Sequence, residues 1–195
     1  MTRGALTRQR ITQGALKLFA ERGVEGSSIR DIAAAANITE PAVYRHFKSK
    51  DDLVWQLFWS GYKSLGETLL KTAGSASGLQ ARLALMIETI CALYDRDTAL
   101  FRFLLLTQHG QLAKITEREK GPVQILKDVL AAAIAAGELP PQDAELATST
   151  VFGIVLQAAT FKVYGRLDKP LADYAQALAA ACWAALHPIP ERKSR

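Results

Sequence analysis

The sequence contains little cysteine: only Cys91 and Cys182 occur in a chain of 195 residues. They lie far apart and inside apolar helical patterns, which excludes the disulfide framework that supports many small secreted domains. Both are expected to be buried, reduced thiols of a cytosolic protein. With 49% apolar residues, a chain of this length can bury a hydrophobic core in one or two domains without disulfides or metals.

Secretion and membrane signals are also missing. No basic start is followed by an apolar block and a small-residue cleavage site. The longest apolar run, over residues 177–186, is much shorter than a bilayer span. We therefore expect a cytoplasmic protein with no membrane partner.

Catalytic patterns are equally scarce. The three histidines, His46, His109 and His187, are scattered, and none lies at metal-ligand spacing with another His, Cys or carboxylate pair. No Gly-x-Ser-x-Gly elbow, phosphate-binding Gly-Lys-Ser/Thr loop or dinucleotide fingerprint occurs. The sequence predicts a protein that is not an enzyme and needs no cofactor or metal. The alternative is an all-helical enzyme without a recognisable catalytic motif.

Positive charge is present but confined to one end of the chain. The formal net charge is +5; the first 50 residues hold nine Lys/Arg and four Asp/Glu, and the other 145 hold fifteen of each. An excess concentrated in this way is typical of polyanion binding, either to nucleic acid or to a membrane surface. Short, capped helices that carry Asp31 and Glu40 among the bases disfavour the membrane surface.

Hydrophobic periodicity in this basic segment predicts three short helices with helix-turn-helix spacing. The first covers about residues 7–22. The second opens at Ser28, which forms a capping box with Asp31. Asn37 tolerates the left-handed conformation that a tight turn requires, and Thr39 is a good N-cap for the third helix.

The third helix is predicted to have one apolar face and one face suited to DNA. Val43 and Phe47 form an i,i+4 pair that can face a core. The other face offers short, aromatic and cationic groups that match base edges and phosphates. The predicted DNA-binding residues are Thr39 at the helix start, the phosphate contacts Ser28, Tyr44, His46 and Lys50, and the base contacts Arg30, Glu40, Ala42 and Arg45.

Residues 7–57 resemble the DNA-binding domain of the TetR family of bacterial transcriptional repressors. Three segments carry the resemblance in family order and spacing: Leu18-Phe19-Ala20-Glu21-Arg22-Gly23, Ser28-Ile29-Arg30-Asp31-Ile32-Ala33, and Val43-Tyr44-Arg45-His46-Phe47-Lys48-Ser49-Lys50 followed by Leu53. One departure is Asn37, where the family more often has Gly. Asn is the next best residue for that geometry, so the turn is still expected.

The resemblance implies an all-α fold with two domains. A three-helix helix-turn-helix DNA-binding domain would cover residues 1–50, a helical effector-binding and dimerisation bundle residues 51–187, and a flexible tail residues 188–195. It also implies a homodimeric repressor that reads a palindromic double-stranded operator and is released by a small-molecule effector. In such dimers the two recognition helices lie about 34–36 Å apart.

Periodicity also lays out the remaining helices. A fourth begins with a capping box of Ser49 and Asp52 and runs to about residue 71. Five more are expected over residues 79–94, 99–108, 117–136, 142–164 and 171–186.

A helix-lined apolar cavity in this part would hold a hydrophobic or aromatic effector. Its predicted lining is Trp59, Tyr62, Met86, Phe101, Phe103, His109, Gln157 and Phe161. The alternative for each of these side chains is ordinary core packing.

The last two helices are rich in small and aromatic residues, which allow helix axes to approach closely. They could pack only within the chain, or form the four-helix dimer interface that the resemblance implies. The predicted interface residues are Phe152, Val155, Ala158, Ala159, Leu178, Ala181, Cys182 and Ala185.

Overall fold

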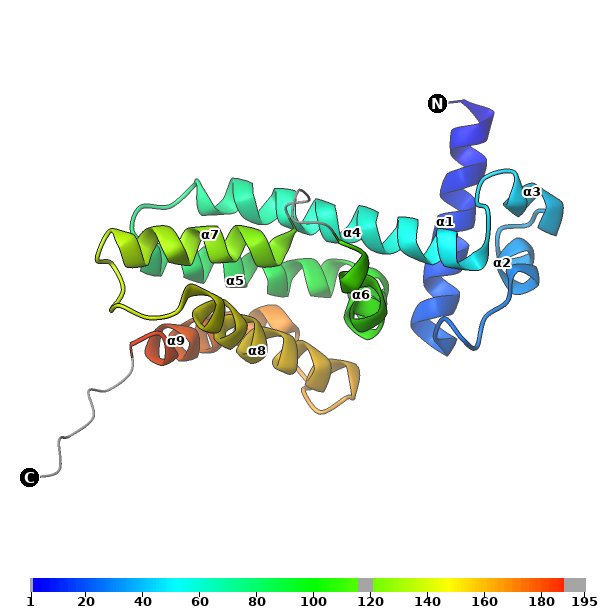
Figure 1. Ribbon diagram of the computed structural model, residues 1–195. Helices are drawn as coiled ribbons and strands as arrows, with labels where there is room; N and C mark the ends of the chain where they lie inside the picture. The colour runs from blue at the N-terminus through cyan, green and yellow to red at the C-terminus, as the bar shows by residue number, and fades with distance from the viewer. Residues whose placement is uncertain (1, 116–120, 188–195) are drawn as a thin grey trace, which may run out of the picture. The chain divides into compact units, whose positions relative to one another are not determined.

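The protein is described by a computed structural model that covers residues 2–115 and 121–187. Within these ranges the chain is helical and contains no strand, which confirms the all-α prediction (Figure 1). The helices are α1 Arg3–Arg22, α2 Ile29–Ala35, α3 Glu40–Tyr44, α4 Lys50–Ala73, α5 Leu79–Arg96, α6 Thr98–Gln111, α7 Pro122–Ala135, α8 Ala144–Val163 and α9 Ala175–Ala185, with 3₁₀ turns η1 Leu112–Lys114 and η2 Leu171–Tyr174.

The chain packs as two compact units. The first comprises Met1–Ser64 and Asp97–Glu119, and the second Leu65–Arg96 and Lys120–Arg195. Helix α6 therefore packs with the helix-turn-helix segment although it follows it by some fifty residues. The predicted domain boundary at residue 50 stays a prediction.

Local capping explains most helix ends in the first unit. Helix α1 starts at Arg3, earlier than predicted, because the Thr2 hydroxyl oxygen accepts a hydrogen bond from the amide of Ala5 at 3.3 Å. The capping box of Ser28 and Asp31 is formed in full at the start of α2. Asn37 has φ 52°, so the turn between α2 and α3 uses the left-handed conformation expected of it.

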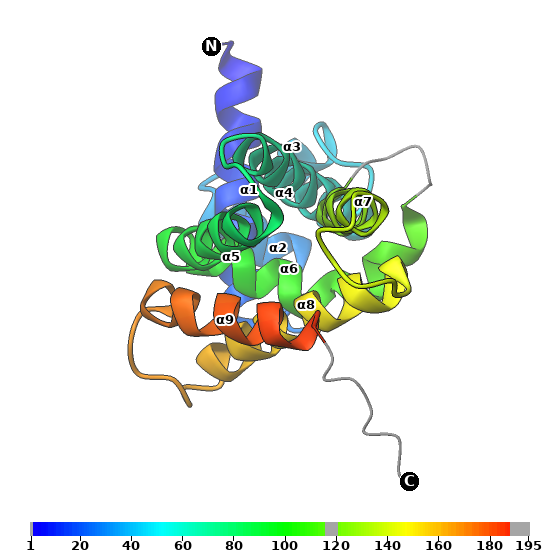
Figure 2. The ribbon, with the colours of Figure 1, turned by 90° about the vertical axis from the view of Figure 1, so that its left-hand side faces the viewer.

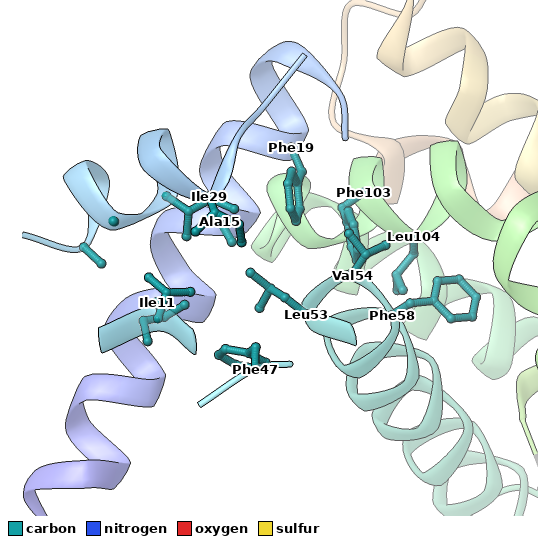
Figure 3. Close-up of a cluster of buried hydrophobic side chains, with 14 residues drawn as sticks. Ile11, Ala15, Phe19, Ile29, Phe47, Leu53, Val54, Phe58, Phe103 and Leu104 are labelled. Atoms are coloured by element: carbon teal, nitrogen blue, oxygen red, sulfur yellow. The ribbon is translucent and has the colours of Figure 1, made fainter. Parts of the chain in front are cut away.

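The core of the first unit joins α1 through α4 with α6 (Figure 3). Ile11, Phe19 and Leu53 are buried there, and the rings of Phe19 and Phe103 stack with centroids 5.6 Å apart. Gly61 in α4 lets α6 approach closely, since a Cβ at this position would lie 2.8 Å from Cδ1 of Leu100. Burial of large apolar side chains on this scale stabilises the unit by about 1.5–3 kcal/mol each.

The second unit contains α5, α7, α8 and α9, with α8 and α9 side by side (Figure 2). Two carboxylates connect distant segments of this unit. Glu138 accepts from the amide of Leu79 at 2.7 Å, and Asp95 accepts from the amides of Leu171 and Ala172 at 2.9 and 2.8 Å. The predicted helix over 171–186 is divided, because its first turn is 3₁₀ helix η2.

Two predictions concern residues outside the described ranges. They are the start of a helix at residue 117 and the tail over residues 188–195.

Helix α8 has the length and composition of a membrane span, and 28% of the residues in its apolar window are buried. The core helix of a soluble protein can meet the same criterion of length and composition.

The two cysteines are free and buried, as predicted. Burial raises the pKa of the Cys91 thiol to about 12 and that of Cys182 to about 11. Both thiols therefore remain protonated and unreactive at neutral pH.

Candidate DNA-binding site

The recognition helix α3 is held by its apolar side and open on its polar side. Val43 is fully buried and Phe47, just after the helix, is 1% exposed. Tyr44 is 53% exposed and Arg45 is also exposed. The short helix therefore packs on the core of the first unit with its apolar side and exposes its polar side to solvent.

The other predicted contacts on this segment are placed as follows. Thr39 and Glu40 are exposed, and Ala42 and His46 are half-buried. Thr39 occupies the N-cap position, but its side chain makes no capping hydrogen bond. Its hydroxyl group is therefore not committed to the helix end.

Ser28 and Arg30 lie at the start of α2, where both are exposed. The Ser28 hydroxyl accepts from the amide of Asp31 and donates to the Asp31 carboxylate at 2.6 Å. Hydrogen bonds from the Ser28 side chain and amide hold the pKa of Asp31 below its ordinary value. Ser28 is thus a structural cap, and its one O–H donor must leave Asp31 to reach a phosphate.

Lys50 opens α4 and contacts the loop between α1 and α2. Its ammonium group donates to the carbonyl oxygens of Val24 at 3.0 Å and Ser27 at 3.1 Å. An ammonium group has three donors, so one remains for a phosphate. This contact with the loop was not expected from the sequence.

The predicted capping box at the start of α4 is half formed. The amide of Asp52 donates to the Ser49 hydroxyl at 3.0 Å, whereas the Asp52 carboxylate accepts from the amide of Lys48 instead of Ser49. Hydrogen bonds from Gln56 and from the Lys48 amide hold the pKa of Asp52 below its ordinary value. The turn that follows the recognition helix is therefore fixed by a carboxylate.

Sequence reasoning missed two residues of this site, Arg8 and Arg10 of α1. In the sequence these two residues contribute only to the count of positive charges. In the structure both guanidinium groups donate hydrogen bonds to backbone carbonyl oxygens next to α3. Nothing in the local sequence signals these contacts, because the partners lie more than twenty-five residues away.

The predicted effector residues divide between the two units. Trp59, Tyr62, Phe101, Phe103 and His109 belong to the first unit, where Phe103 packs on Phe19 in the core and His109 is exposed. Met86, Gln157 and Phe161 belong to the second. Neither unit by itself brings all eight together.

An open hollow of about 560 Å³ lies on the surface of α8 and α9, and it is almost entirely apolar. Gln157 and Phe161 line it together with Ala158 and Leu178, two of the predicted interface residues. The hollow therefore combines side chains that the sequence assigned to two different sites.

The predicted dimer interface needs correction at three positions. Val155, Ala159 and Cys182 each have 0% exposure within the single chain, so they belong to its own core and cannot meet a second copy. Phe152, Ala158 and Leu178 are half-buried, and Ala181 and Ala185 are exposed. Helical periodicity places residues on a common face, but does not say which face is turned inwards.

Comparison with known proteins gives a consistent family. Residues 11–57 match the profile of bacterial regulatory proteins of the tetR family. The fatty acid metabolism regulator protein of Bacillus subtilis is 28% identical over 155 residues, which is 77% of this chain and 80% of that protein. The transcriptional regulator AcrR of Shigella flexneri is 42% identical over 65 residues, 33% of this chain and 30% of AcrR.

Solved structures agree in fold. FadR of Bacillus subtilis, in complex with stearoyl-CoA, superimposes with a TM-score of 0.77 at 22% identity, covering 92% of this chain and 99% of FadR. FadR of Bacillus halodurans gives a TM-score of 0.82 at 20% identity, covering 95% and 97% of the two chains. Together with the helix-turn-helix geometry, these likenesses identify residues 11–57 as a DNA-binding domain of the TetR family and the chain as a DNA-binding transcriptional regulator.

Proposed function

We propose that this regulator represses transcription as a homodimer that reads a palindromic operator and leaves it when a small apolar effector binds. The observation that carries the proposal is the geometry of α3, with Val43 and Phe47 buried and Tyr44 and Arg45 exposed. A helix anchored on one side and bare on the other fits the major groove. Arg30, Glu40, Ala42 and Arg45 would contact bases.

The phosphate contacts would come from the residues around the helix ends. Tyr44 is exposed at the end of α3, and half-buried His46 lies just after the helix. The Thr39 hydroxyl, at the start of α3, makes no capping hydrogen bond. Lys50 would contribute the donor that remains after its two bonds within the unit, whereas the Ser28 hydroxyl would have to leave Asp31 to donate to a phosphate. Such contacts fix the register of the protein on DNA without reading its sequence.

A second copy of the chain would cover the apolar surface of α8 and α9. Phe161 and Tyr164 are 39% and 64% exposed, and the apolar hollow lies on the same pair of helices. Exposed apolar surface of this kind marks an interaction site, and a two-fold dimer pairs the same patch from both copies. The remaining candidates are Phe152, Ala158, Leu178, Ala181 and Ala185.

The effector class follows from the predicted apolar lining and from one relative. Stearoyl-CoA is bound to the Bacillus subtilis FadR that shares this fold. Long-chain acyl-CoA thioesters are therefore the first compounds to test here. The protein would act in the cytoplasm.

Helix α4 is the proposed lever between effector and operator. It begins next to the recognition segment and supplies residues to both compact units. An effector that moves α4 would change the separation of the two recognition helices, so that the dimer no longer fits adjacent grooves.

The test is selection of bound sequences from a random duplex library, followed by footprinting and sedimentation of the complex. We expect an enriched inverted repeat, whose half-site centres lie about one helical turn or a multiple of it apart. Two copies should protect it. Absence of any enriched sequence would refute the reading function, and a protected single half-site bound by one copy would refute the dimer.

A further inference from the structure

The recognition helix is too short to hold its own orientation. Helix α3 contains five residues, Glu40–Tyr44, and isolated helices of this length are unstable in water. Its apolar contacts through Val43 and Phe47 keep it on the core. Fixing its two ends requires further contacts, and α1 supplies them.

Arg8 of α1 holds the segment that follows α3. Its Nη1 donates to the carbonyl oxygen of His46 at 3.3 Å, and its guanidinium carbon lies 4.5 Å from the centre of the Phe47 ring. Its Nη2 donates to Oε1 of Gln56. One planar, permanently charged group thus joins three partners around the link between α3 and α4.

These contacts continue into the start of α4. Nε2 of Gln56 donates to one carboxylate oxygen of Asp52 at 2.8 Å, and the other oxygen accepts from the amide of Lys48 at 2.8 Å. Hydrogen bonds from Arg8 through Gln56 and Asp52 thus connect the carbonyl of His46 with the amide of Lys48. The segment from His46 to Lys48 cannot rotate without breaking one of these bonds.

Arg10 of α1 holds the segment that precedes α3. Its Nη2 donates to the carbonyl oxygens of Ala36 and Asn37, the latter at 3.1 Å. This is the turn in which Asn37 adopts φ 52°. Carbonyl oxygens at the end of a helix carry partial negative charge and lack partners in the helix, so a guanidinium group there is favourable.

We infer that Arg8 and Arg10 are positioning residues for sequence-specific DNA binding, holding the segments before and after α3 from one helix so that its base-reading face keeps one orientation. The inference rests on the proposed DNA-reading function. Two of the nine basic residues in the first 50 are then committed to the geometry of the first unit and not to phosphates.

Positioning and phosphate binding have different consequences. Hydrogen bonds to base edges need donor–acceptor distances of about 2.7–3.2 Å, so a small rotation of α3 weakens them. Attraction to phosphates tolerates such a rotation and determines the salt dependence of binding. Loss of a positioning arginine should therefore lower specificity and leave general DNA affinity unchanged.

The experiment measures the affinity of each variant for the operator selected by the wild-type protein and for a random duplex of equal length, at several salt concentrations. The variants are Arg8→Ala, Arg10→Ala and Arg8→Lys, with Lys17→Ala as the control because Lys17 is an exposed cation of the same helix. Circular dichroism checks that each variant is folded.

We expect both alanine variants to bind the operator about tenfold more weakly, comparable to the loss of one base contact, with random-duplex affinity and salt slope unchanged. Arg8→Lys keeps the charge but loses the planar fork, so it should show the same pattern even if Arg8→Ala fails to fold. Lys17→Ala should keep the wild-type specificity ratio.

Three results would overturn the inference. Equal losses on both duplexes, with a salt slope shallower by about one unit, would make the arginines phosphate contacts. Wild-type operator affinity in Arg10→Ala or Arg8→Lys would mean that these arginines do not orient α3. If the wild-type protein selects no sequence, the proposed function fails and this inference with it.

Discussion

Single side chains around the recognition helix differ in whether their polar atoms are already bonded. The Arg45 side chain is exposed and makes no hydrogen bond to another of the residues that the structure describes. The ammonium group of Lys50, in contrast, donates to the carbonyl oxygens of Val24 and Ser27. A side chain that can extend into the major groove can contact base edges. A side chain already bonded to a loop of its own unit has only its unused N–H donor available for DNA.

Arg45→Ala should weaken operator binding by about 1–3 kcal/mol and leave binding to random DNA nearly unchanged, because it removes a base contact. Lys50→Ala should weaken binding to both duplexes and make the salt slope shallower by about one unit. Titrations of both variants on both duplexes separate the two roles. Equal losses for Arg45→Ala would remove it from the base-reading residues.

The carboxylate of Asp31, which caps α2, should make the stability of the fold depend on pH. The pKa of Asp31 is lowered in the folded protein, so its ionised form stabilises the fold above the ordinary value of 3.8, and this contribution is lost as pH falls through the folded pKa. Asp31→Asn should therefore be less stable than wild type at pH 6, with the difference narrowing below pH ~4. Urea unfolding across this range measures it; a constant difference would contradict the cap.

At the scale of elements, α8 and α9 each have a buried face and an exposed face that carries apolar side chains. The buried side chains of Val155, Ala159 and Cys182 face the core of the second unit. The residues between them, such as Phe161 and Ala181, remain exposed. This all-round apolar character is what gives α8 the composition of a membrane span.

Ala181→Glu should dissociate the dimer without unfolding the chain, because the position is exposed in a single copy but buried without a partner charge in the proposed dimer. Sedimentation should show monomers, and operator binding should fall with dimerisation. Ala159→Glu is the contrasting variant, since its site is fully buried and the chain itself should be destabilised. A dimer that persists in Ala181→Glu and Ala185→Glu would defeat the assignment.

At the scale of the whole molecule, the proposed repression and release must be thermodynamically coupled. If an acyl-CoA weakens operator binding by some factor, operator DNA must weaken acyl-CoA binding by the same factor. Calorimetric titration with and without operator tests this equality. A compound that binds tightly and leaves operator affinity unchanged would mean that α4 is not a lever.

Tyr62→Ala is the variant for this titration, because Tyr62 lies in α4, where its ring contacts Phe58 with centroids 5.4 Å apart, and is half-buried. We expect weaker effector binding with operator affinity retained. Phe101→Ala probes α6, but Phe101 is 6% exposed and its loss should also cost about 3–5 kcal/mol of stability.

The sequence by itself determined the elements whose signals are local. The capping box of Ser28 and Asp31, the left-handed Asn37 and the i,i+4 pair of Val43 and Phe47 each depend on residues within one or two turns, and all three are present in the structure. The same segment carried enough family-specific order to identify the DNA-binding domain.

Only the tertiary structure decided which side chains meet across the chain. Phe103 stacks on Phe19 in the first unit, Arg8 and Arg10 bond to carbonyls beside α3, and Cys182 faces inwards. Periodicity shows that a helix has an apolar face, but many packings satisfy that pattern equally. Which one forms depends on shape complementarity between residues far apart in sequence, and no local signal encodes it.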